Sequence, residues 1–214
     1  MKTLDLFSLK GKKGFITGAA RGIGKCLAEA FTEMGASIAI VDIDIEEAEK
    51  TAGELTDRYS AHTTAIRCDV TDAEDVKRMM ETFIKEYGTI DFAINNAGIA
   101  NTYPAEEISS KDFKKVVDIN LNGVFLTAQA AARQMIKEGK AGSIVNTASM
   151  SAHIINTPQT IANYCASKGG VLLLTKALAV EWAQYNIRVN CVSPGYMATE
   201  LVAEIEEYAR RMDI

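Results

Sequence analysis

The sequence lacks a long apolar run and has no excess of positive charge. Its longest hydrophobic stretch, VLLLTKALAV, contains Lys176 and is too short to cross a bilayer. The first residues, MKTLDLFSLKGKKG, have no apolar core of the kind found in signal peptides. A formal net charge of −5 without a basic stripe argues against a nucleic-acid partner. We therefore expect a cytoplasmic protein that binds neither membrane nor nucleic acid.

Cysteine and histidine are also sparse, with four cysteines and two histidines. The cysteines form no CxxC pair and show no metal-ligand spacing with histidine, so we expect free thiols in a reducing compartment and no metal site. Cys165 directly follows Tyr164 and is either a reactive thiol or a packed side chain. We favour the packed side chain.

Short apolar runs alternate with helical patterns over the whole chain of 214 residues, with no linker and no low-complexity segment. The expected strands span residues 14–17, 37–42, 63–69, 90–95, 143–148 and 187–193. The expected helices span residues 22–34, 45–58, 72–87, a stretch from Ser109 or Ser110 to about 138, 164–185 and 200–212. Strands that are apolar throughout and separated by helices predict a parallel sheet covered on both faces. The expected fold is one doubly wound α/β domain over residues 1–214, with its ligand crevice at the carboxyl ends of the strands.

A glycine-rich turn, TGAARGIG, follows the first expected strand. Its glycines Gly18, Gly22 and Gly24 permit a tight turn and the close approach of a phosphate. The N-terminus of the next helix then presents unpaired N–H groups and the positive end of its dipole to a pyrophosphate. The spacing is GxxxGxG and not the commoner GxGxxG. The loop predicts a dinucleotide site, and the alternative is a structural turn without a ligand.

Asp42 ends the second expected strand, where an acidic side chain hydrogen-bonds an adenosine ribose 2′-OH and repels a 2′-phosphate. This favours NAD over NADP, and Asp44 adds further negative charge. Arg21 in the glycine loop is the opposing signal, because an arginine there can meet a 2′-phosphate. We give Asp42 the greater weight.

Two further strand ends carry polar or small residues. Asp69 and Val70 end the third strand, where an adenine would lie. The segment NNAG, residues 95–98, ends the fourth strand and suits a chain that passes beside a cofactor. A plain turn built from asparagine and glycine is the alternative for NNAG.

These features, in this order, resemble the short-chain dehydrogenase/reductase family over nearly the whole chain. The residues that carry the resemblance are TGAARGIG, Asp42, Asp69-Val70, NNAG, Asn120 in VVDINLNG, Ser149 in IVNTASMS, YCASK at 164–168 and SPGYMAT at 193–199. The resemblance implies a Rossmann fold, an NAD(P)-dependent oxidoreductase of CH–OH groups, and a homodimer or homotetramer. The implied cofactor contacts are Gly18, Arg21, Gly22, Ile23, Gly24, Asp42, Asp69, Val70, Asn96, Ala97, Gly98, Tyr164, Lys168, Pro194, Gly195, Met197 and Thr199.

By the same resemblance Tyr164 is the general acid/base. A free phenol has a pKa of about 10, and a cationic neighbour favours its ionised form. We expect Lys168, one helical turn on, and the positive nicotinamide to lower the pKa of Tyr164. In the family Lys168 also holds the nicotinamide ribose. Asn120 connects through water to Lys168 as a proton relay.

Ser149 is implied as the hydrogen-bond donor to the reacting oxygen. Ser151 has the spacing to Tyr164 that many family members use, but Ser149 directly ends the fifth strand, and we choose it. The loop SMSAHIINTPQT resembles that of members acting on polyols, ketoses and sugar acids, and Ser151, His153, Asn156 and Gln159 are its expected substrate contacts. The alternatives are a reductase of 3-oxoacyl thioesters or hydroxysteroid-like ketones, and an NAD-binding regulator without activity.

Family members usually continue well beyond the SPGYMAT segment. Since this chain ends at Ile214, we expect it to lack the family's seventh strand and part of the segment that covers the substrate. The expectation leaves the Ser149, Tyr164, Lys168 and Asn120 group intact.

Overall fold

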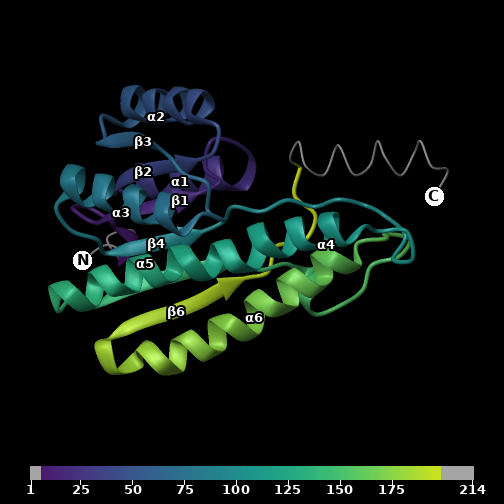
Figure 1. Ribbon diagram of the computed structural model, residues 1–214. Helices are drawn as coiled ribbons and strands as arrows, with labels where there is room; N and C mark the ends of the chain where they lie inside the picture. Colours follow the sequence, from purple (N-terminus) through teal and green to yellow (C-terminus); the bar gives the residue numbers. More distant parts are fainter. Residues whose placement is uncertain (1–5, 199–214) are drawn as a thin grey trace.

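The computed structural model of the protein describes residues 6–198. Six strands form one sheet: β1 (Lys13–Thr17), β2 (Ser37–Asp42), β3 (Thr63–Arg67), β4 (Phe92–Asn95), β5 (Gly142–Thr147) and β6 (Ile187–Val192). All neighbours are parallel, in the order β3-β2-β1-β4-β5-β6 (Figure 1). The predicted doubly wound α/β fold is confirmed. The helix predicted over residues 200–212 lies outside the described residues.

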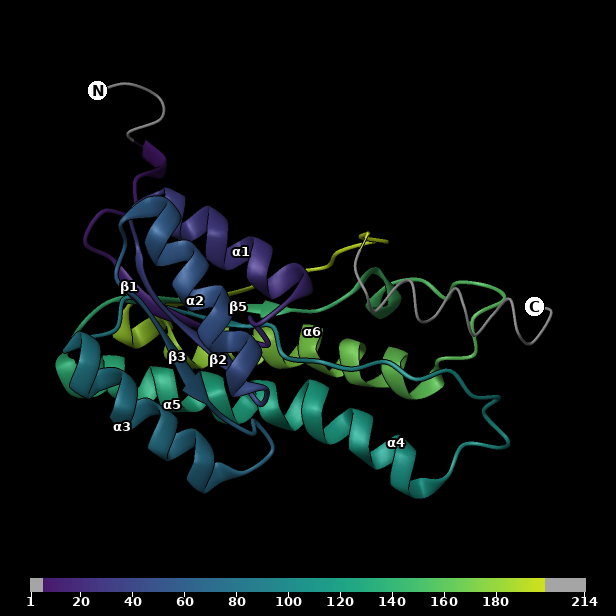
Figure 2. The ribbon, with the colours of Figure 1, turned by 90° about the horizontal axis from the view of Figure 1, so that it is seen from above.

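Helices cover both faces of the sheet. On one side lie α1 (Gly22–Glu33) and α2 (Ile45–Tyr59), and on the other α3 (Ala73–Tyr87), α5 (Gly123–Glu138) and α6 (Ala162–Trp182) (Figure 2). Two apolar cores result, because successive side chains of a strand point to opposite faces. In β1, Phe15 packs into the core beneath α3, α5 and α6, whereas Ile16 packs into the core beneath α1 and α2.

Side-chain caps explain several helix ends that the sequence predicts. Asp44 accepts a hydrogen bond from the backbone of Glu47 at the start of α2. Asp72 caps α3, which ends at Gly88 in a left-handed conformation. Ser109 caps α4 (Ser110–Val117). Short polar side chains satisfy the unpaired N–H groups of a first helical turn in this way.

A π-helix, Asp118–Asn122, joins α4 to α5. The sequence predicts helix across this region but carries no signal for the wide turn. Single π-helical turns inside longer helices often occur at functional sites. Here the wide turn contains Asn120, whose side chain is fully buried.

The order of the strands places β1 between β2 and β4. The chain leaves β1 toward one edge of the sheet and later returns to build the other half. In such sheets ligands bind outside the carboxyl ends of the strands, where the strand order reverses. The site is therefore expected at the ends of β1 and β4.

Candidate active site and cofactor crevice

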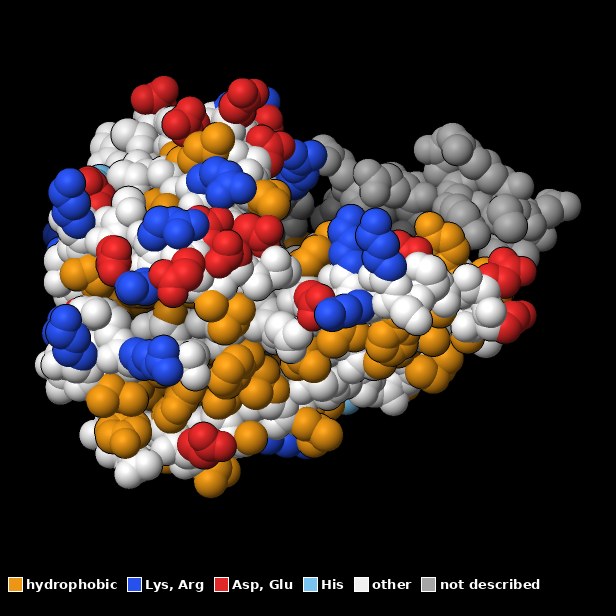
Figure 3. Space-filling view, in the orientation of Figure 1, with side chains coloured by type: hydrophobic (Ala, Val, Ile, Leu, Met, Phe, Trp, Pro, Cys, Tyr) orange, Lys and Arg blue, Asp and Glu red, His pale blue; other side chains and the backbone are white. Residues whose placement is uncertain are grey.

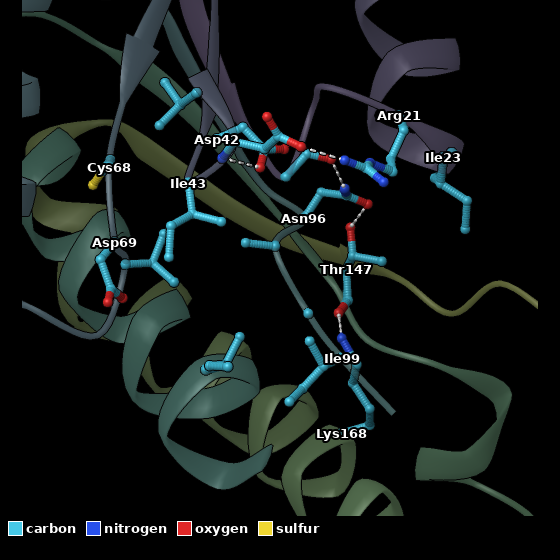
Figure 4. Close-up of a pocket in the computed structure, with 18 of the residues that line it drawn as sticks. Arg21, Ile23, Asp42, Ile43, Cys68, Asp69, Asn96, Ile99, Thr147 and Lys168 are labelled. Carbon is cyan, nitrogen blue, oxygen red and sulfur yellow. Dashed lines mark hydrogen bonds and ion pairs between the residues drawn. The ribbon is translucent and has the colours of Figure 1, made fainter. Parts of the chain in front are cut away.

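A crevice of about 520 Å³ lies at this position (Figure 4). It runs from the ends of β1 and β2 to the first turn of α6. The predicted site residues that line it are Gly18, Arg21, Gly22, Ile23, Asp42, Asp69, Val70, Asn96, Ala97, Gly98, Tyr164 and Lys168. The fold thus brings residues from five separate segments of the sequence to one hollow.

The glycine loop packs closely against the end of β4. Gly18 has a φ of 62°, and a Cβ atom added there would lie 2.7 Å from the Cα atom of Ala97. Gly24 does not line the crevice, contrary to its expected place among the cofactor contacts. A Cβ atom at Gly24 would lie 2.1 Å from the carbonyl oxygen of Gly18. The missing side chain of Gly24 therefore lets the first turn of α1 pack against the glycine loop. Gly18 and Gly22, which line the crevice, leave room for a phosphate to approach the backbone.

We expect Gly24→Ala to lower the free energy of unfolding by about 3 kcal/mol, because its added methyl group meets backbone that must shift. Gly53→Ala is the matched control, since Gly53 lies within α2 with open space around its Cβ position. This control is expected to raise the free energy of unfolding by about 0.5–1 kcal/mol. Denaturant unfolding followed by circular dichroism measures both changes, and equal effects in the two variants would contradict the packing argument.

Asn96 joins the glycine loop to β4. Its Nδ2 atom donates to the carbonyl oxygens of Thr17 and Gly18, at 3.2 and 3.0 Å. The Thr17 hydroxyl oxygen accepts from the backbone N–H groups of Asn96 and Ala97, at 3.0 and 3.1 Å. The NNAG segment is therefore fixed to the glycine loop where both line the crevice.

Two carboxylates and one guanidinium meet where β2 ends. Asp42 accepts hydrogen bonds from the backbone N–H groups of Ala20 and Asp44, both at 3.1 Å. Arg21 reaches from the glycine loop and forms an ion pair with Asp44, with 2.5 Å between Nη2 and Oδ2. This end of the crevice thus has more negative than positive side chains.

Lys168 lies at the other end of the crevice, almost completely buried. Its Nζ atom donates a hydrogen bond to the carbonyl oxygen of Thr147 at 2.7 Å, a bond that Figure 4 also shows. The same atom lies 5.7 Å from the centre of the Tyr164 ring. Burial lowers the pKa of Lys168 from 10.5 to about 8.

The pKa of Tyr164 is raised above its ordinary value, mainly by burial, and a hydrogen bond with the Ser149 side chain lowers it in part. The lowering expected from Lys168 together with the positive nicotinamide stays a prediction. In the described structure the Lys168 ammonium group donates to the carbonyl oxygen of Thr147. A raised pKa keeps the phenol protonated at neutral pH.

Asn120 holds the loop that follows β4. Its Oδ1 atom accepts from the Ile99 N–H at 2.8 Å, and its Nδ2 atom donates to the Ile99 carbonyl at 2.9 Å and to the Ser167 hydroxyl at 3.1 Å. Asn120 and Lys168 both lie beside Gly98, where an added Cβ atom would be 3.2 Å from Oδ1 and 3.5 Å from Nζ. Asn120 therefore positions the backbone of the loop that passes between the crevice and Lys168.

The two candidate serines differ in their surroundings, although both are buried. The Ser149 hydroxyl oxygen accepts from the Ser151 N–H at 3.1 Å. Ser149 is also the serine whose side chain lowers the pKa of Tyr164 in part, which places it near the phenol.

Replacing these serines is expected to separate their roles. If Ser149 has its predicted role, Ser149→Ala removes the donor to the reacting oxygen and should lower kcat about 10²-fold. Ser151→Ala is expected to retain kcat and to raise KM, because Ser151 is a predicted substrate contact. Steady-state kinetics of the two variants measures both parameters, and a larger loss of kcat in Ser151→Ala would contradict the assignment.

Other predicted residues lie away from the crevice. Pro194, Gly195 and Met197 do not line it, and Thr199 lies outside the described residues. His153 is exposed and its Nε2 atom lies 3.1 Å from the Ser193 hydroxyl. His153 lies in the segment after β5, and Pro194, Gly195 and Met197 lie in the segment after β6.

The loop after β5 contains the remaining predicted substrate contacts. Gln159 and Asn156 are half-buried. The Nδ2 atom of Asn156 is buried and has no hydrogen-bond partner among the described residues.

Burial raises the pKa of Cys165, which keeps this thiol protonated as a packed side chain would be.

Sequence reasoning missed several residues of the crevice: Val41, Ile43, Cys68, Ile99, Ile119 and Thr147. Most are apolar side chains that form its walls and belong to no motif. Thr147 could have been predicted from the sequence, because it ends β5 and the carboxyl ends of neighbouring parallel strands meet at one edge of the sheet.

The described residues contain no cluster of three or more His, Cys, Asp or Glu side chains that could hold a metal ion. All four cysteines are free thiols. Within residues 6–198, no helix combines the length and the apolar character needed to cross a membrane.

A glycine loop at the switch point of a parallel sheet suits a dinucleotide. A buried phenol beside an amine at the same crevice can exchange a proton with an alcohol or a ketone. Fold and site together define the class of nicotinamide-dependent oxidoreductases.

The chain belongs to the short-chain dehydrogenase family, whose sequence model matches residues 12–210. It is 44% identical over 200 residues to a sorbose reductase of Candida albicans, covering 92% of this chain and 70% of that protein. It is 44% identical over 195 residues to a D-threitol dehydrogenase of Mycolicibacterium smegmatis, covering 91% and 74%. The protein is thus an NAD(P)-dependent oxidoreductase that acts on CH–OH groups, as predicted.

Solved structures agree in fold. A short-chain type dehydrogenase/reductase from Mycobacterium marinum has a TM-score of 0.94 and 46% identity, covering 98% of this chain and 82% of that one. A gluconate 5-dehydrogenase from Burkholderia cenocepacia, in complex with NADP and tartrate, has a TM-score of 0.90 and 37% identity, covering 96% and 79%. An NAD⁺-bound xylitol dehydrogenase has a TM-score of 0.86 and 37% identity, covering 92% and 75%.

Proposed function

We propose that this protein interconverts a polyol, ketose or sugar acid with its oxidised or reduced partner, using NAD(H). The observation that carries the chemistry is that Tyr164 and the buried Lys168 both line one end of the crevice, with 5.7 Å between the Lys168 Nζ atom and the centre of the Tyr164 ring. The substrate class is supported by similar proteins that act on sorbose, D-threitol, gluconate and xylitol.

The polar loop after β5 also supports a substrate with several hydroxyl groups. Each buried hydroxyl group needs a hydrogen-bond partner, since an unpaired one costs about 1–3 kcal/mol. Asn156 has a buried Nδ2 donor without a partner among the described residues, and Gln159 is only half-buried. His153 adds an exposed ring in the same loop.

The residues around the reacting oxygen have distinct tasks in this proposal. The nicotinamide, when bound, supplies the hydride chemistry. Tyr164 holds a proton on its phenol oxygen and exchanges it with the substrate oxygen. Ser149 donates a hydrogen bond to that oxygen and stabilises its developing charge. Lys168 provides the nearby positive charge, and Asn120 positions the adjacent backbone through Ile99.

Asp42 and Asp44 favour NAD over NADP in this proposal. Both line the crevice with Arg21, so its end near β2 has two negative groups for one positive group. A 2′-phosphate would bring about −1.5 to −2 further charges to this place, whereas a 2′-OH brings none.

The test is the change in nicotinamide absorbance with NADH or NADPH against a panel of ketoses, sugar acids and one acetoacetyl thioester. We expect turnover of a ketose or keto acid with NADH. Turnover with the thioester alone would contradict the substrate class. Turnover with NADPH alone would contradict the cofactor preference and leave the reaction class standing.

The proposal includes a homodimer built on α5 and α6. Figure 3 shows hydrophobic side chains gathered over the lower part of the molecule, where Figure 1 places these helices. On α6, Leu173 and Val180 have exposed fractions of 66% and 79% and lie seven residues apart, hence on one face. Contiguous exposed apolar surface of this kind marks an interaction site.

We expect the double variant Leu173→Glu/Val180→Glu to be a monomer where the unmodified protein is a dimer. Light scattering after size-exclusion chromatography measures the mass. Ile155→Glu is the control, because Ile155 is equally exposed but lies in the loop after β5. An unchanged mass in the double variant would exclude this face as the interface.

A further inference from the structure

Tyr164 lies in the first turn of α6, where the backbone N–H groups of a helix have no partner within the helix. Ile161, which precedes this helix, has an apolar side chain and forms no capping hydrogen bond. We propose that Asn163, held in turn by Asn101, replaces the missing cap and fixes Tyr164 in place for proton exchange. The two asparagines are positioning residues. The inference rests on the proposed function, because it needs Tyr164 as the group that exchanges the proton.

Two side-chain amides form a chain of hydrogen bonds that ends at Tyr164. The Oδ1 atom of Asn101 accepts from Asn163 Nδ2 at 2.5 Å, and the Oδ1 atom of Asn163 accepts from the Tyr164 N–H at 2.8 Å. Asn163 has an exposed fraction of only 1%, so water does not readily replace either partner. Hydrogen bonds connected in this way polarise and strengthen one another. A change at Asn101 therefore reaches the backbone of Tyr164 through Asn163.

The carbonyl group of Tyr164 is held from the same side of the molecule. Its oxygen accepts from the Ser167 hydroxyl at 2.8 Å, and the Ser167 hydroxyl accepts from Asn120 Nδ2 at 3.1 Å. Asn120 in turn hydrogen-bonds the backbone of Ile99. Ile99 and Asn101 belong to one loop, the loop after β4. This loop is thus connected to both backbone groups of Tyr164.

Tyr164 needs this support more than Lys168 does. The Lys168 side chain is buried and its Nζ atom is attached to the carbonyl oxygen of Thr147. Tyr164 lies one turn nearer the end of α6, and helix ends are where local opening is easiest. The relative position of the phenol and the amine therefore depends on how well the first turn of α6 is ordered.

The loop after β4 has other attachments that do not involve the Asn101 side chain. On one side of Asn101, the backbone of Ile99 is bonded to Asn120. On the other side, the Tyr103 N–H donates to the Thr160 carbonyl oxygen at 2.9 Å. A substitution at Asn101 thus breaks the link to the start of α6 and leaves both backbone attachments of the loop.

Asn101→Ala is the first test, because Asn101 is only half-buried. With NADH and fructose as the probe ketose, we expect kcat to fall about tenfold, since a small misplacement of a catalytic group costs up to about 10²-fold. KM and the dissociation constant of NADH should stay nearly unchanged, because the crevice itself is untouched. Steady-state kinetics and a fluorescence titration measure these quantities.

Three further variants show whether the chain of hydrogen bonds is the cause. Asn101→Asp keeps an oxygen that accepts from Asn163 and should retain kcat. In Asn101→Ala/Asn163→Ala the two losses should not add, because both residues act through one chain. Gln134→Ala is the matched control and should also retain kcat. The Nε2 atom of Gln134 likewise donates to a side-chain oxygen, Glu138 Oε1 at 2.6 Å, but within α5.

A second measurement needs no substrate. Protein labelled with isotopic nitrogen at its seven tyrosines gives one backbone amide signal for each, and Tyr164→Phe assigns the signal of Tyr164. Loss of the support from Asn101 should make hydrogen exchange at this amide about fivefold faster in Asn101→Ala. Asn101→Asp and Gln134→Ala should exchange at the rate of the unmodified protein.

The outcomes separate this inference from the proposed function. Unchanged exchange at the Tyr164 amide in Asn101→Ala overturns the inference, and so does an equal loss of kcat in Asn101→Asp. A lower temperature of unfolding with an unchanged kcat would assign the pair to stability alone and would also overturn it. Absence of turnover by the unmodified protein with every ketose and sugar acid would contradict the proposed function. The exchange rates would then still show whether the two asparagines hold Tyr164.

Discussion

Replacing Tyr164 with phenylalanine is expected to lower kcat/KM about 10³-fold and to leave the affinity for the dinucleotide nearly unchanged. The change removes one oxygen atom, which exchanges the proton in the proposed reaction. The ring stays in place within its half-buried surroundings at the start of α6. Steady-state kinetics and a fluorescence titration of NADH measure the two quantities.

Tyr185→Phe is the matched control, because Tyr185 follows the same helix but has an exposed fraction of 42%. It should behave like the unmodified protein. Turnover that persists in Tyr164→Phe would instead favour the alternative of a dinucleotide-binding regulator. The result therefore decides between an enzyme and a binding protein, even before its substrate is known.

Replacing Lys168 with methionine is expected to lower kcat about 10²-fold. Methionine fills similar space but cannot supply the positive charge beside Tyr164. The temperature of unfolding should not fall at pH 7, because a buried charge that is replaced by an apolar group of similar volume is often neutral or stabilising. Lys176→Met, an exposed lysine two turns further along α6, is the control for the same chemical change.

The pH dependence of the unmodified enzyme gives a second signature of Lys168. Its pKa is lowered to about 8, so the ammonium form is present below pH 8 and is lost as the pH rises through this value. The pKa of Tyr164 is raised, so the phenol stays protonated over the same range. We expect kcat/KM for ketone reduction to fall as the pH rises through about 8. The same inflection in Lys168→Met would show that another group is responsible.

The ionisation of Lys168 affects stability in the opposite direction to activity as the pH rises. Its pKa is about 8 in the folded protein and near 10.5 when the chain is unfolded. Between these values the unfolded state binds more protons, so this group makes the fold more stable as the pH rises. Activity and stability should therefore separate above pH 8, and Lys168→Met should remove this contribution from both profiles.

Much of the fold follows from local patterns in the sequence. Strand β2 spans Ser37–Asp42 as predicted, because its apolar residues end at a polar one on each side. The helix predicted over residues 72–87 matches α3, which Asp72 caps and Gly88 ends, and the helix predicted from Ser109 or Ser110 begins as α4 after the Ser109 cap. Strand β4 begins two residues later than predicted, at Phe92, although the Asp91 backbone already hydrogen-bonds Lys13 and Ser143 of the neighbouring strands.

The site was less completely predictable, since several of its contacts join residues far apart in the chain. Asn163 donates to Asn101 at 2.5 Å and so connects the start of α6 to the loop after β4. No motif contains both residues. The π-helix around Asn120 has no recognisable composition. The pKa of Tyr164 depends mainly on burial, which residue spacing does not show.

The position of β1 between β2 and β4 has a thermodynamic consequence. The crevice takes the glycine loop and Asp42 from one half of the sheet, and Gly98, Tyr164 and Lys168 from the other. A chain in which only one half is folded offers a dinucleotide only part of its contacts. Any ligand of the complete crevice therefore stabilises both halves jointly, by about 2.7 kcal/mol at a free concentration of about 100 times Kd. The cofactor concentration around the protein then contributes to how firmly β1 and β4 hold the two halves of the sheet together.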